Sequence, residues 1–499
     1  MLKNIFSNWV SLFVSVILAF FVSPILVHTL GKYLYGVWTL IVSITGYFTI
    51  LDFGVNTAIV RYISKYVAQK DYKEARGIYS TSFFLFTCIG VCALFFSVLF
   101  GVRFKNIFTI EHLSALYIFV SFMIVAIDLI VGLIFSVFLG TLAGLQEFQK
   151  INAVAIIVNI LKNCIIVILL QSGYSLISIA VVQLAASLLR GGSYYIIIKY
   201  KYSFLFLTFH AVNRQVIKKI YNYSIYSFLI ALSLKVLFYT DAVVIGSLVN
   251  VSEVTYYAIP SSLLDYIEKF VWAMIAVMIP MVSGFDALGS KDWNRNLYET
   301  YTKYIQVVYM PIIIALWCFG DDFINVWMGT EIAIHSKNVL KILLFGYGIA
   351  FSQLIAHGIL KGIGKHRILS FILLFEAAAN LLISILLARP FGISGVAIGT
   401  AVPLVLSTIA IIIYTCRQMN ISMVKYLYSS YSGVIVASVG TVFLFRYSAS
   451  QFSYAGIFLN SALCTLVFYF IITPLCLRKE FRQVLGFCLR RYNIYRGKI

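Results

Sequence analysis

The sequence predicts an all-α, polytopic membrane protein with about fourteen transmembrane helices. The first observation is composition: 62% of the 499 residues are apolar and 11% are charged, less than half the roughly 25% charged residues of a soluble domain. The second is the recurrence, from end to end, of apolar stretches of roughly twenty residues, the length that a helix needs to cross a hydrocarbon core of ~30 Å. The third is that most charges lie in the short segments between these stretches.

Charge clusters and turn residues separate the apolar stretches and set the predicted helix ends. The predicted transmembrane helices cover residues 8–30, 36–60, 78–101, 116–139, 151–171, 175–197, 222–248, 258–282, 301–320, 338–361, 368–388, 394–416, 428–446 and 453–475. The narrowest divisions are Gln171 to Tyr174 and Arg389 to Gly392. The first stretch lacks the small-residue cleavage pattern of a signal peptide, so we expect it to remain as the first helix.

The basic residues predict the orientation, because Lys and Arg resist translocation and stay on the cytoplasmic side. Most of the 38 basic residues fall in alternate segments that are cytoplasmic if the N-terminus is inside. We therefore expect a multi-pass protein of a bacterial inner membrane with both termini cytoplasmic. This topology accounts for the net charge of +20, and we expect no nucleic-acid partner, since no soluble basic module is present. The eight cysteines lack metal-ligand spacing, so we expect no metal site.

A weak internal repeat predicts the domain organisation. Tyr35 matches Tyr256 and Lys70-Asp71-Tyr72 matches Lys291-Asp292-Trp293 at one constant offset. Two halves of six helices in the same orientation are a transporter architecture with the substrate site between them. We therefore predict an N-terminal lobe of helices 1–6 at residues 1–215, a C-terminal lobe of helices 7–12 at 216–420, helices 13–14 at 421–476, and a basic cytoplasmic tail at 477–499.

Ionisable residues inside the predicted helices are the candidate functional residues. Each costs ~2.5–3.5 kcal/mol near mid-membrane, so several together must line a wet cavity or pair with one another. They are Asp128, Lys162, Arg190, Lys235, Asp241, Asp265, Glu268, Lys269 and Glu376. We predict interhelical hydrogen bonds for Asn159, Lys162 and Asn163, and for their repeat counterparts Glu376 and Asn380.

The densest group lies on predicted helices seven and eight. Asp265, Glu268, Lys269 and Trp272 follow the spacing i, i+3, i+4, i+7 and therefore share one face. Lys235 has no acid one turn away on its own helix, so we predict that it faces the cavity. Internal neutralisation stays open, because Asp265 precedes Lys269 by one turn and Asp241 could pair with Lys235 or Lys269.

Seven motifs follow one another along nearly the whole chain. They are LGKYLYGVW from Leu30, LDFGV from Leu51, RYIS from Arg61, YTDAVVIG from Tyr239, PMVS from Pro280, FINVWMG from Phe323 and GISGVAIGT from Gly392. In their order and spacing they resemble the polysaccharide transporter family, which holds the O-antigen and capsule-type flippases of the multidrug/oligosaccharidyl-lipid/polysaccharide exporter superfamily.

The resemblance implies two six-helix lobes around a central cavity lined mainly by helices one, two, seven and eight, plus two C-terminal helices. It implies a flippase rather than an enzyme, with no catalytic residues, that moves a polyprenyl-pyrophosphate-linked oligosaccharide to the outer leaflet. Asp52, Arg61 and Asp241 fall on typical family positions, and Asp52 and Arg61 are candidates for a cytoplasmic gate. The implied cationic cavity points to Lys235 and Lys269, although three nearby acids make this cavity less purely cationic.

The expected partners are the lipid-linked oligosaccharide and membrane lipids, with a glycan polymerase or glycosyltransferases as further candidates. We expect no cofactor, and coupling to H⁺ or Na⁺ through Asp241, Asp265 or Glu268 is an open hypothesis. One alternative is a cation-coupled multidrug exporter of the same superfamily, in which the acids are primary. The other is an integral-membrane glycan polymerase or ligase, for which Asp321, Asp322, Glu331 and His335 are the available groups.

Overall fold

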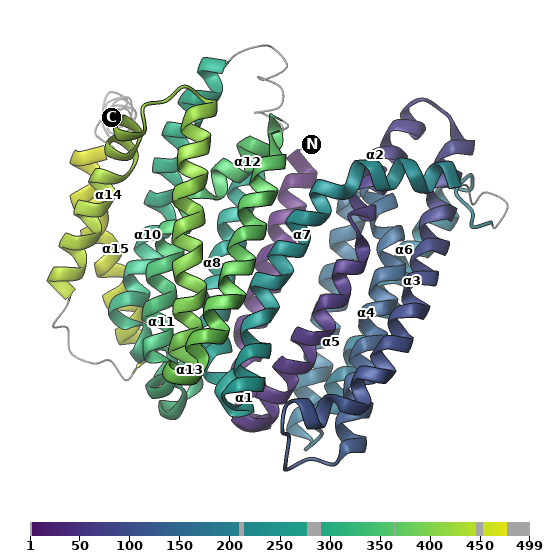
Figure 1. The fold of residues 1–499 in the computed structure, drawn as a ribbon, viewed down its shortest axis with the longest axis horizontal. Helices are drawn as coiled ribbons and strands as arrows, with labels where there is room; N and C mark the ends of the chain where they lie inside the picture. Colours follow the sequence, from purple (N-terminus) through teal and green to yellow (C-terminus); the bar gives the residue numbers. More distant parts are fainter. Residues whose placement is uncertain (1, 209–213, 277–290, 364, 446–452, 477–499) are drawn as a thin grey trace, which may run out of the picture. The chain divides into compact units, whose positions relative to one another are not determined.

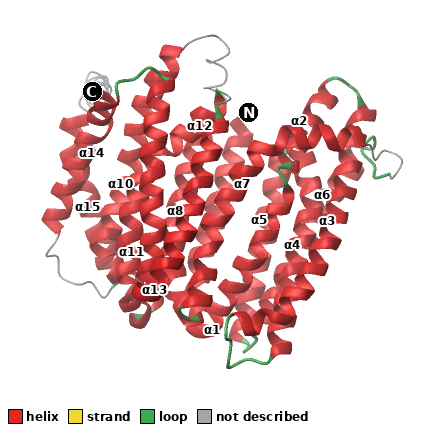
Figure 2. Ribbon diagram, viewed as in Figure 1, coloured by secondary structure: helices red, strands yellow, loops and turns green. Residues whose placement is uncertain are grey.

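The computed structural model describes residues 2–208, 214–276, 291–363, 365–445 and 453–476, and these are helical with short connections and contain no strand (Figure 2). Eleven helices in this part of the chain are long and apolar enough to cross a membrane. The predicted fold class of an all-α polytopic membrane protein is therefore confirmed. The predicted tail at 477–499 and the PMVS motif from Pro280 lie outside the described residues.

Figure 1 shows the elements in sequence colours, and their bounds in chain order follow. They are α1 (Leu2–Gly46), η1 (Tyr47–Asp52), α2 (Val55–Ala68), α3 (Tyr72–Ile107), α4 (Ala115–Gly144), α5 (Phe148–Gln171), α6 (Leu176–Lys201), α7 (Arg214–Leu248), α8 (Val251–Ala276), α10 (Lys291–Met328), α11 (Thr330–Ala350), η3 (Phe351–Gln353), α12 (Leu354–Gly362), α13 (His366–Gln418), α14 (Met423–Phe445) and α15 (Tyr454–Cys476).

Two of the long helices, α1 and α13, run from one predicted span into the next across a sharp bend at a glycine. In α1 the bend is at Gly31 (φ 72°, ψ 166°), and in α13 it is at Gly392 (φ 57°, ψ −141°). Residues with a Cβ atom rarely adopt a positive φ, so glycine is the residue that permits these bends. Both lie at predicted divisions between helices. The 26-residue α8 adds a further helix of membrane-spanning length that carries several charges.

The second predicted span, 36–60, is not one continuous helix. The α-helix ends at Gly46, and a 3₁₀ turn, η1, continues to Asp52. Phe53 (φ 47°) and Gly54 (φ 72°) then turn the chain into α2. Successive residues with positive φ end a helix, and the periodicity of apolar residues did not reveal this break.

The described helices form two compact units, and we describe each by itself. The first unit contains residues 1–266 and 366–403, and the second contains 267–365 and 404–499. The division into lobes at residues 215 and 420 stays a prediction.

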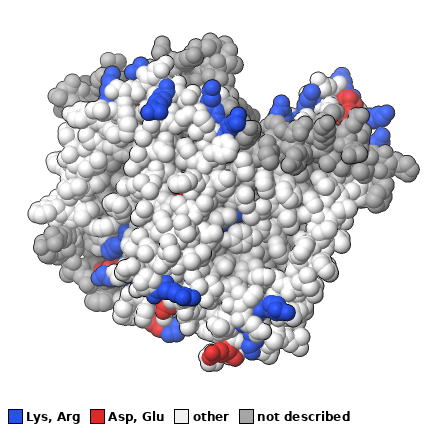
Figure 3. All heavy atoms as spheres, viewed as in Figure 1, with Lys and Arg blue, Asp and Glu red and all other residues white. Residues whose placement is uncertain are grey.

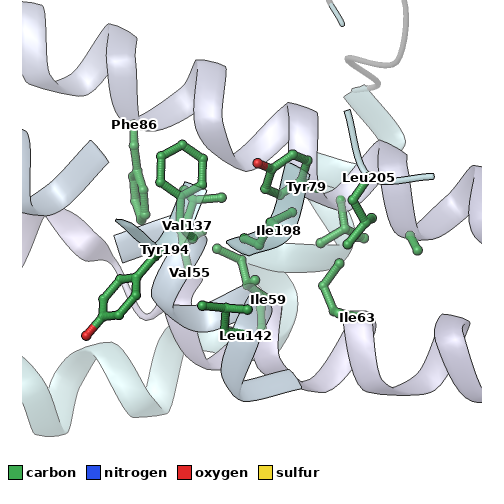
Figure 4. Packing of buried hydrophobic residues seen from close by; sticks show 14 of the residues in the cluster. Val55, Ile59, Ile63, Tyr79, Phe86, Val137, Leu142, Tyr194, Ile198 and Leu205 are labelled. Atoms are coloured by element: carbon green, nitrogen blue, oxygen red, sulfur yellow. The ribbon is translucent and has the colours of Figure 1, made fainter. Parts of the chain in front are cut away.

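The core of the first unit lies where α2, α3, α4 and α6 meet. Figure 4 shows Val55, Ile59 and Ile63 of α2 packed with aromatic and branched residues of the other three helices. Tyr79, Phe86, Val137 and Ile198 in this cluster have no exposed surface. Burial of these side chains fixes the packing of α2, which carries the gate candidate Arg61, against its neighbours.

The second unit is held together by a buried network of tyrosines around the 3₁₀ turn η3. Gln353 accepts a hydrogen bond from Tyr298 (2.9 Å) and donates to Tyr426 (3.2 Å) and Tyr431 (2.6 Å). The Tyr298 and Tyr426 rings stack with centroids 4.6 Å apart. These hydrogen bonds give the buried side chains of Gln353 and the three tyrosines their partners at the break between α11 and α12. They also join α14 to α10.

Charged side chains lie mostly near the helix ends on the face shown in Figure 3, with a broad uncharged region between them. The connection between the predicted helices 301–320 and 338–361 is itself helical, and only Gly329 separates α10 from α11. Within it, Asp321 forms ion pairs with Lys337 (3.4 Å) and Lys341 (3.7 Å). These groups therefore stabilise a helix junction.

Candidate functional site

A buried carboxylate, Asp241, forms the centre of the candidate site in the first unit. It lies on α7 and is 5% exposed. Its Oδ2 accepts hydrogen bonds from Tyr257 Oη of α8 (2.5 Å) and Thr400 Oγ1 of α13 (2.8 Å), and its Oδ1 accepts from Asn380 Nδ2 of α13 (3.5 Å). Side chains of three helices thus converge on one carboxylate.

The bend in α13 brings Asn380 and Thr400 together. After Gly392 the helix doubles back, so that Asn380 Nδ2 reaches Thr400 Oγ1 (3.0 Å) and the carbonyl of Gly399 (3.4 Å). A Cβ at Gly399 would lie 2.7 Å from the backbone nitrogen of Ser384, so glycine permits this close approach. The predicted interhelical hydrogen bond of Asn380 is therefore present.

The partners of Asp241 are neutral. Among the side chains described in the first unit, no lysine or arginine forms an ion pair with it, so the suggested pairing with Lys235 is not present, and the pairing with Lys269 stays a prediction. Burial of a carboxylate among neutral groups is costly, and a bound cation or a proton would lower that cost. The buried Oδ1 atom of Asn380 also has no hydrogen-bond donor in the described part of the chain. The cluster therefore offers one oxygen atom without a donor among the described side chains, Asn380 Oδ1, next to a carboxylate.

Lys235 lies farther back on α7, about one and a half turns before Asp241. Its Nζ is 5.4 Å from the ring centroid of Tyr239, and the side chain is half-buried. No acidic side chain in the described ranges forms an ion pair with Lys235, whereas Asp265 of α8 interacts electrostatically with Tyr239. The structure therefore brings Lys235 and Asp265 to the same tyrosine.

Tyr239 and its neighbour Thr240 connect this region to α1 and η1. The rings of Tyr239 and Tyr47 lie with centroids 5.7 Å apart, and Tyr47 Oη is 2.7 Å from Thr240 Oγ1. A Cβ at Gly46 would lie 2.4 Å from the Tyr239 ring. The end of α1 is consequently fitted against the segment of α7 that carries both Lys235 and Asp241.

The other predicted residues of α8 belong to the second unit. Glu268 Oε1 accepts a hydrogen bond from Trp272 Nε1 (3.2 Å), and Lys269 is exposed. The helix continues unbroken through these positions, so the shared face predicted from their spacing is geometrically sound. Their role in substrate binding stays a prediction.

The two gate candidates lie on either side of the start of α2. Asp52 Oδ1 accepts the backbone N–H of Asn56 (3.0 Å), which satisfies a free donor in the first turn of this helix. Arg61 is exposed on α2, with its guanidinium 6.0 Å from the ring centroid of Tyr62. Asp52 thus has a local structural role, and the gate function stays a prediction.

The remaining intramembrane polar groups join helices of the first unit. Gln183 of α6 donates to Asp128 of α4 (3.1 Å), and Asn159 of α5 donates to Ser15 of α1 (3.4 Å). Lys162 of α5 lies near two charged groups, Arg190, whose like charge repels it, and Asp128, whose opposite charge attracts it. Glu376 is 3% exposed, one turn before Asn380. The interhelical role predicted for Asn159 agrees with this geometry.

Sequence reasoning did not assign roles to Tyr239, Tyr257 or Thr400, although Tyr239 and Thr400 lie in the quoted motifs. Tyrosine and threonine are common in membrane helices, and neither carries a charge that would single it out. For Tyr239 the sequence does contain a signal, because this residue precedes the charged Asp241 by two positions. The contact of Thr400 with Asp241 depends on the bend at Gly392 and has no sequence pattern.

A helical membrane protein with buried charged groups on α7 and α13 has a feature that is common in membrane transporters. The fold is similar to that of solved membrane proteins. The lipid II flippase MurJ in an inward closed conformation aligns with a TM-score of 0.67 at 15% identity, covering 93% of this chain and 98% of that chain. An inward-facing multidrug resistance MATE family transporter of the MOP superfamily also aligns with a TM-score of 0.67, at 13% identity, covering 81% and 94%.

The family model described as "Polysaccharide biosynthesis protein" matches residues 1–285, and the chain belongs to this family. A Shigella flexneri protein named "Putative O-antigen transporter" is 21% identical over 395 residues, which cover 77% of this chain and 90% of the relative. The resemblance identified from the sequence motifs is confirmed.

Proposed function

We propose that this protein is a flippase that moves a polyprenyl-pyrophosphate-linked oligosaccharide, such as an O-antigen or capsule unit, from the cytoplasmic to the outer leaflet of a bacterial inner membrane. The family match and the likeness in sequence to an O-antigen transporter support this cargo. The single structural observation that carries the proposal is Lys235. It is a half-buried cation inside a membrane helix, held over Tyr239 and without an acidic ion-pair partner among the described side chains.

Such a cation suits an anionic cargo. An unpaired lysine near mid-membrane is costly, and a bound pyrophosphate compensates the charge. In the proposed cycle the two halves alternate between inward and outward access, the polyprenyl tail remains in the bilayer, and the sugars pass through the protein. A negative cell interior favours outward movement of an anion by ~2.3 kcal/mol per charge per 100 mV, so the membrane potential assists the transfer.

The Asp241 cluster supports ion coupling as part of the same proposal. Na⁺ or H⁺ compensates the carboxylate that Tyr257, Asn380 and Thr400 surround with neutral groups. Binding or release of this ion changes the charge next to Thr240, which is hydrogen-bonded to Tyr47 of η1. Ion exchange thereby biases the packing of α1 against α7 during the return of the empty transporter.

The test replaces Lys235 with Ala and with Arg and measures lipid-linked glycan in the outer leaflet. We expect Lys235→Ala to lower transport at least about tenfold, because a charge-assisted contact to the phosphate is lost, and Lys235→Arg to retain a measurable part. The matched control is Lys73→Ala, which removes an equal charge from an exposed position on α3.

Full transport by Lys235→Ala would contradict the role of the lysine. Absence of glycan accumulation on the inner leaflet in cells without the protein would contradict the flippase function itself. Export of a drug cation that depends on Asp241 would instead support the multidrug exporter alternative.

A further inference from the structure

A second cation held against an aromatic ring lies in the second unit, outside the site described above. Lys361 Nζ lies 5.2 Å from the ring centroid of Trp272, and the ring centroid of His357 lies 6.1 Å from the same indole. Trp272 belongs to α8, whereas His357 and Lys361 are one turn apart on α12 and therefore share a face. One ring thus contacts two basic side chains.

The indole is fixed in orientation. Trp272 Nε1 donates a hydrogen bond to Glu268 Oε1 (3.2 Å), one turn earlier on α8. The ring is half-buried, while Lys361 is exposed. Because the tryptophan is held in place, it orients the ammonium group above it while leaving that group accessible.

The charge of Lys361 is not compensated by an acid. A comparable pair, Lys341 over Trp317 with 5.6 Å between Nζ and ring centroid, has its ammonium group 3.7 Å from the carboxylate of Asp321. In the described part of the chain, no acidic side chain forms an ion pair with Lys361. The Trp317 pair is therefore part of a structural ion cluster, whereas the Trp272 pair retains a positive charge for a ligand.

The position of Lys361 in the chain limits which ligands can reach the Trp272, His357 and Lys361 side chains. Lys361 is the penultimate residue of the membrane-spanning segment Thr330–Gly362, and Lys365 and Arg367 follow it. This pattern predicts the cytoplasmic interface. An anion reaching the group must therefore lie at the headgroup level of the inner leaflet.

We propose that Trp272, His357 and Lys361 form an entry subsite for the diphosphate of the polyprenyl-linked glycan, an inference that rests on the proposed function. Lys361 binds the phosphate oxygens, His357 donates a hydrogen bond from its imidazole, and Trp272 positions Lys361. The subsite collects the headgroup at the interface before it moves to Lys235 deeper in the membrane.

The experiment uses the full-length protein in phosphatidylcholine nanodiscs and titrates inorganic pyrophosphate by calorimetry. Lys361→Gln keeps the length of the side chain and removes its charge, Lys361→Arg keeps the charge, and Trp272→Phe keeps an aromatic ring. Lys365→Ala is the matched control, because it removes an exposed charge four residues away that contacts no described ring. Each variant is first checked for a monodisperse elution profile.

We expect Lys361→Gln to weaken pyrophosphate binding at least about tenfold, whereas Lys361→Arg, Trp272→Phe and Lys365→Ala stay within about threefold of the wild type. Trp272→Ala should weaken binding, and its effect should disappear when Lys361 is already Gln, as expected of a positioning residue. Unchanged binding in Lys361→Gln, or equal losses in Lys361→Gln and Lys365→Ala, would overturn the subsite.

Two further measurements are needed. One distinguishes a phospholipid headgroup from the lipid-linked glycan as the source of the phosphate, and the other distinguishes failure of the subsite from failure of the proposed flippase function. If phosphatidylglycerol in the nanodisc abolishes pyrophosphate binding and Lys361→Gln transports glycan normally in cells, the group binds phospholipid and the proposal is wrong. If wild-type cells transport glycan and Lys361→Gln cells do not, the subsite is supported. Failure of the wild type to transport glycan contradicts the proposed function, while the pyrophosphate titration still decides whether the subsite exists.

Discussion

At the scale of single residues, Asp241 combines deep burial with neutral hydrogen-bond partners. Three donors from α8 and α13 converge on the carboxylate, and this number of donors can stabilise an anion even where water is excluded. Removal of the carboxylate takes away the acceptor that these donors share, although Asn380 and Thr400 keep their hydrogen bond to each other. Structural and ion-binding contributions of this residue can therefore be separated by two different substitutions.

We expect Asp241→Asn to fold and Asp241→Ala to be destabilised. Asn keeps the shape and an acceptor for Tyr257, whereas Ala leaves the polar side chains of Tyr257, Asn380 and Thr400 without their shared partner, at a cost of about 1–3 kcal/mol for each unsatisfied group. The measurement is thermal unfolding in detergent with and without Na⁺. Added Na⁺ should raise the unfolding temperature of the wild type and leave that of Asp241→Asn unchanged.

Equal stabilisation of both proteins by Na⁺ would show that the sodium ion binds elsewhere. Glycan transport by Asp241→Asn that responds to the ion gradient as the wild type does would rule out coupling through this carboxylate. A neutral change at Asn159, such as Asn159→Ser, controls for loss of an amide on a different helix of the same unit.

At the scale of elements, the second half of α1 is packed unusually closely against α7 and the start of α8. A Cβ at Gly36 would lie 2.2 Å from the carbonyl oxygen of Val251, and a Cβ at Gly246 would lie 2.5 Å from Leu40. Thr255 Oγ1 donates to the carbonyl of Lys32 (2.6 Å). Glycines here allow backbones to approach, as in many membrane helix pairs.

We expect Gly36→Ala to destabilise the protein by about 1–3 kcal/mol, because the added methyl group meets backbone that cannot move aside without shifting α1. Transport should fall as well, since α1 leads directly into Tyr47 and its bond to Thr240. The control is Gly132→Ala on α4, where a Cβ would meet nothing within 4 Å. That change should be neutral or stabilise by roughly 0.5–1 kcal/mol.

Thermal unfolding of the two alanine variants measures the difference, together with outer-leaflet glycan in cells. A stable and fully active Gly36→Ala protein would show that the contact between α1 and α8 is not needed during transport. Instability of both variants would indicate a general sensitivity to glycine replacement.

The elements also show what could be predicted from the sequence. Helix number and approximate ends follow from hydropathy because the bilayer imposes a length on each apolar run. The bends at Gly31 and Gly392 fall where turn residues divide these runs. The break at Phe53 and Gly54 was missed, because it depends on backbone conformation within a segment of ordinary hydropathy.

The candidate site was predictable only in part. Charge alone singled out Lys235 and Asp241, because ionisable groups in membrane helices are rare. The ring under Lys235 and the partners of Asp241 are neutral side chains, and Asn380 and Thr400 approach from a helix more than a hundred residues away. Such contacts arise from tertiary packing and leave no local pattern in a single sequence.

At the scale of the whole molecule, the direction of transport depends on which helix ends face the cytoplasm. The distribution of Lys and Arg predicts that both termini are inside, and the positions proposed for Lys361 and for the entry of the glycan both rely on this orientation. The orientation also decides whether the membrane potential assists or opposes movement of the pyrophosphate.

Single cysteines in a cysteine-free protein test this orientation in spheroplasts. Lys73 at the start of α3 and Arg389 beside the bend of α13 are both exposed, so cysteines there can react from water. We expect a membrane-impermeant maleimide to label Arg389→Cys in intact spheroplasts and Lys73→Cys only after the membrane is opened. The reverse pattern would place Lys361 at the outer face, where it could not collect a glycan assembled inside, and would require an anion to move against the potential.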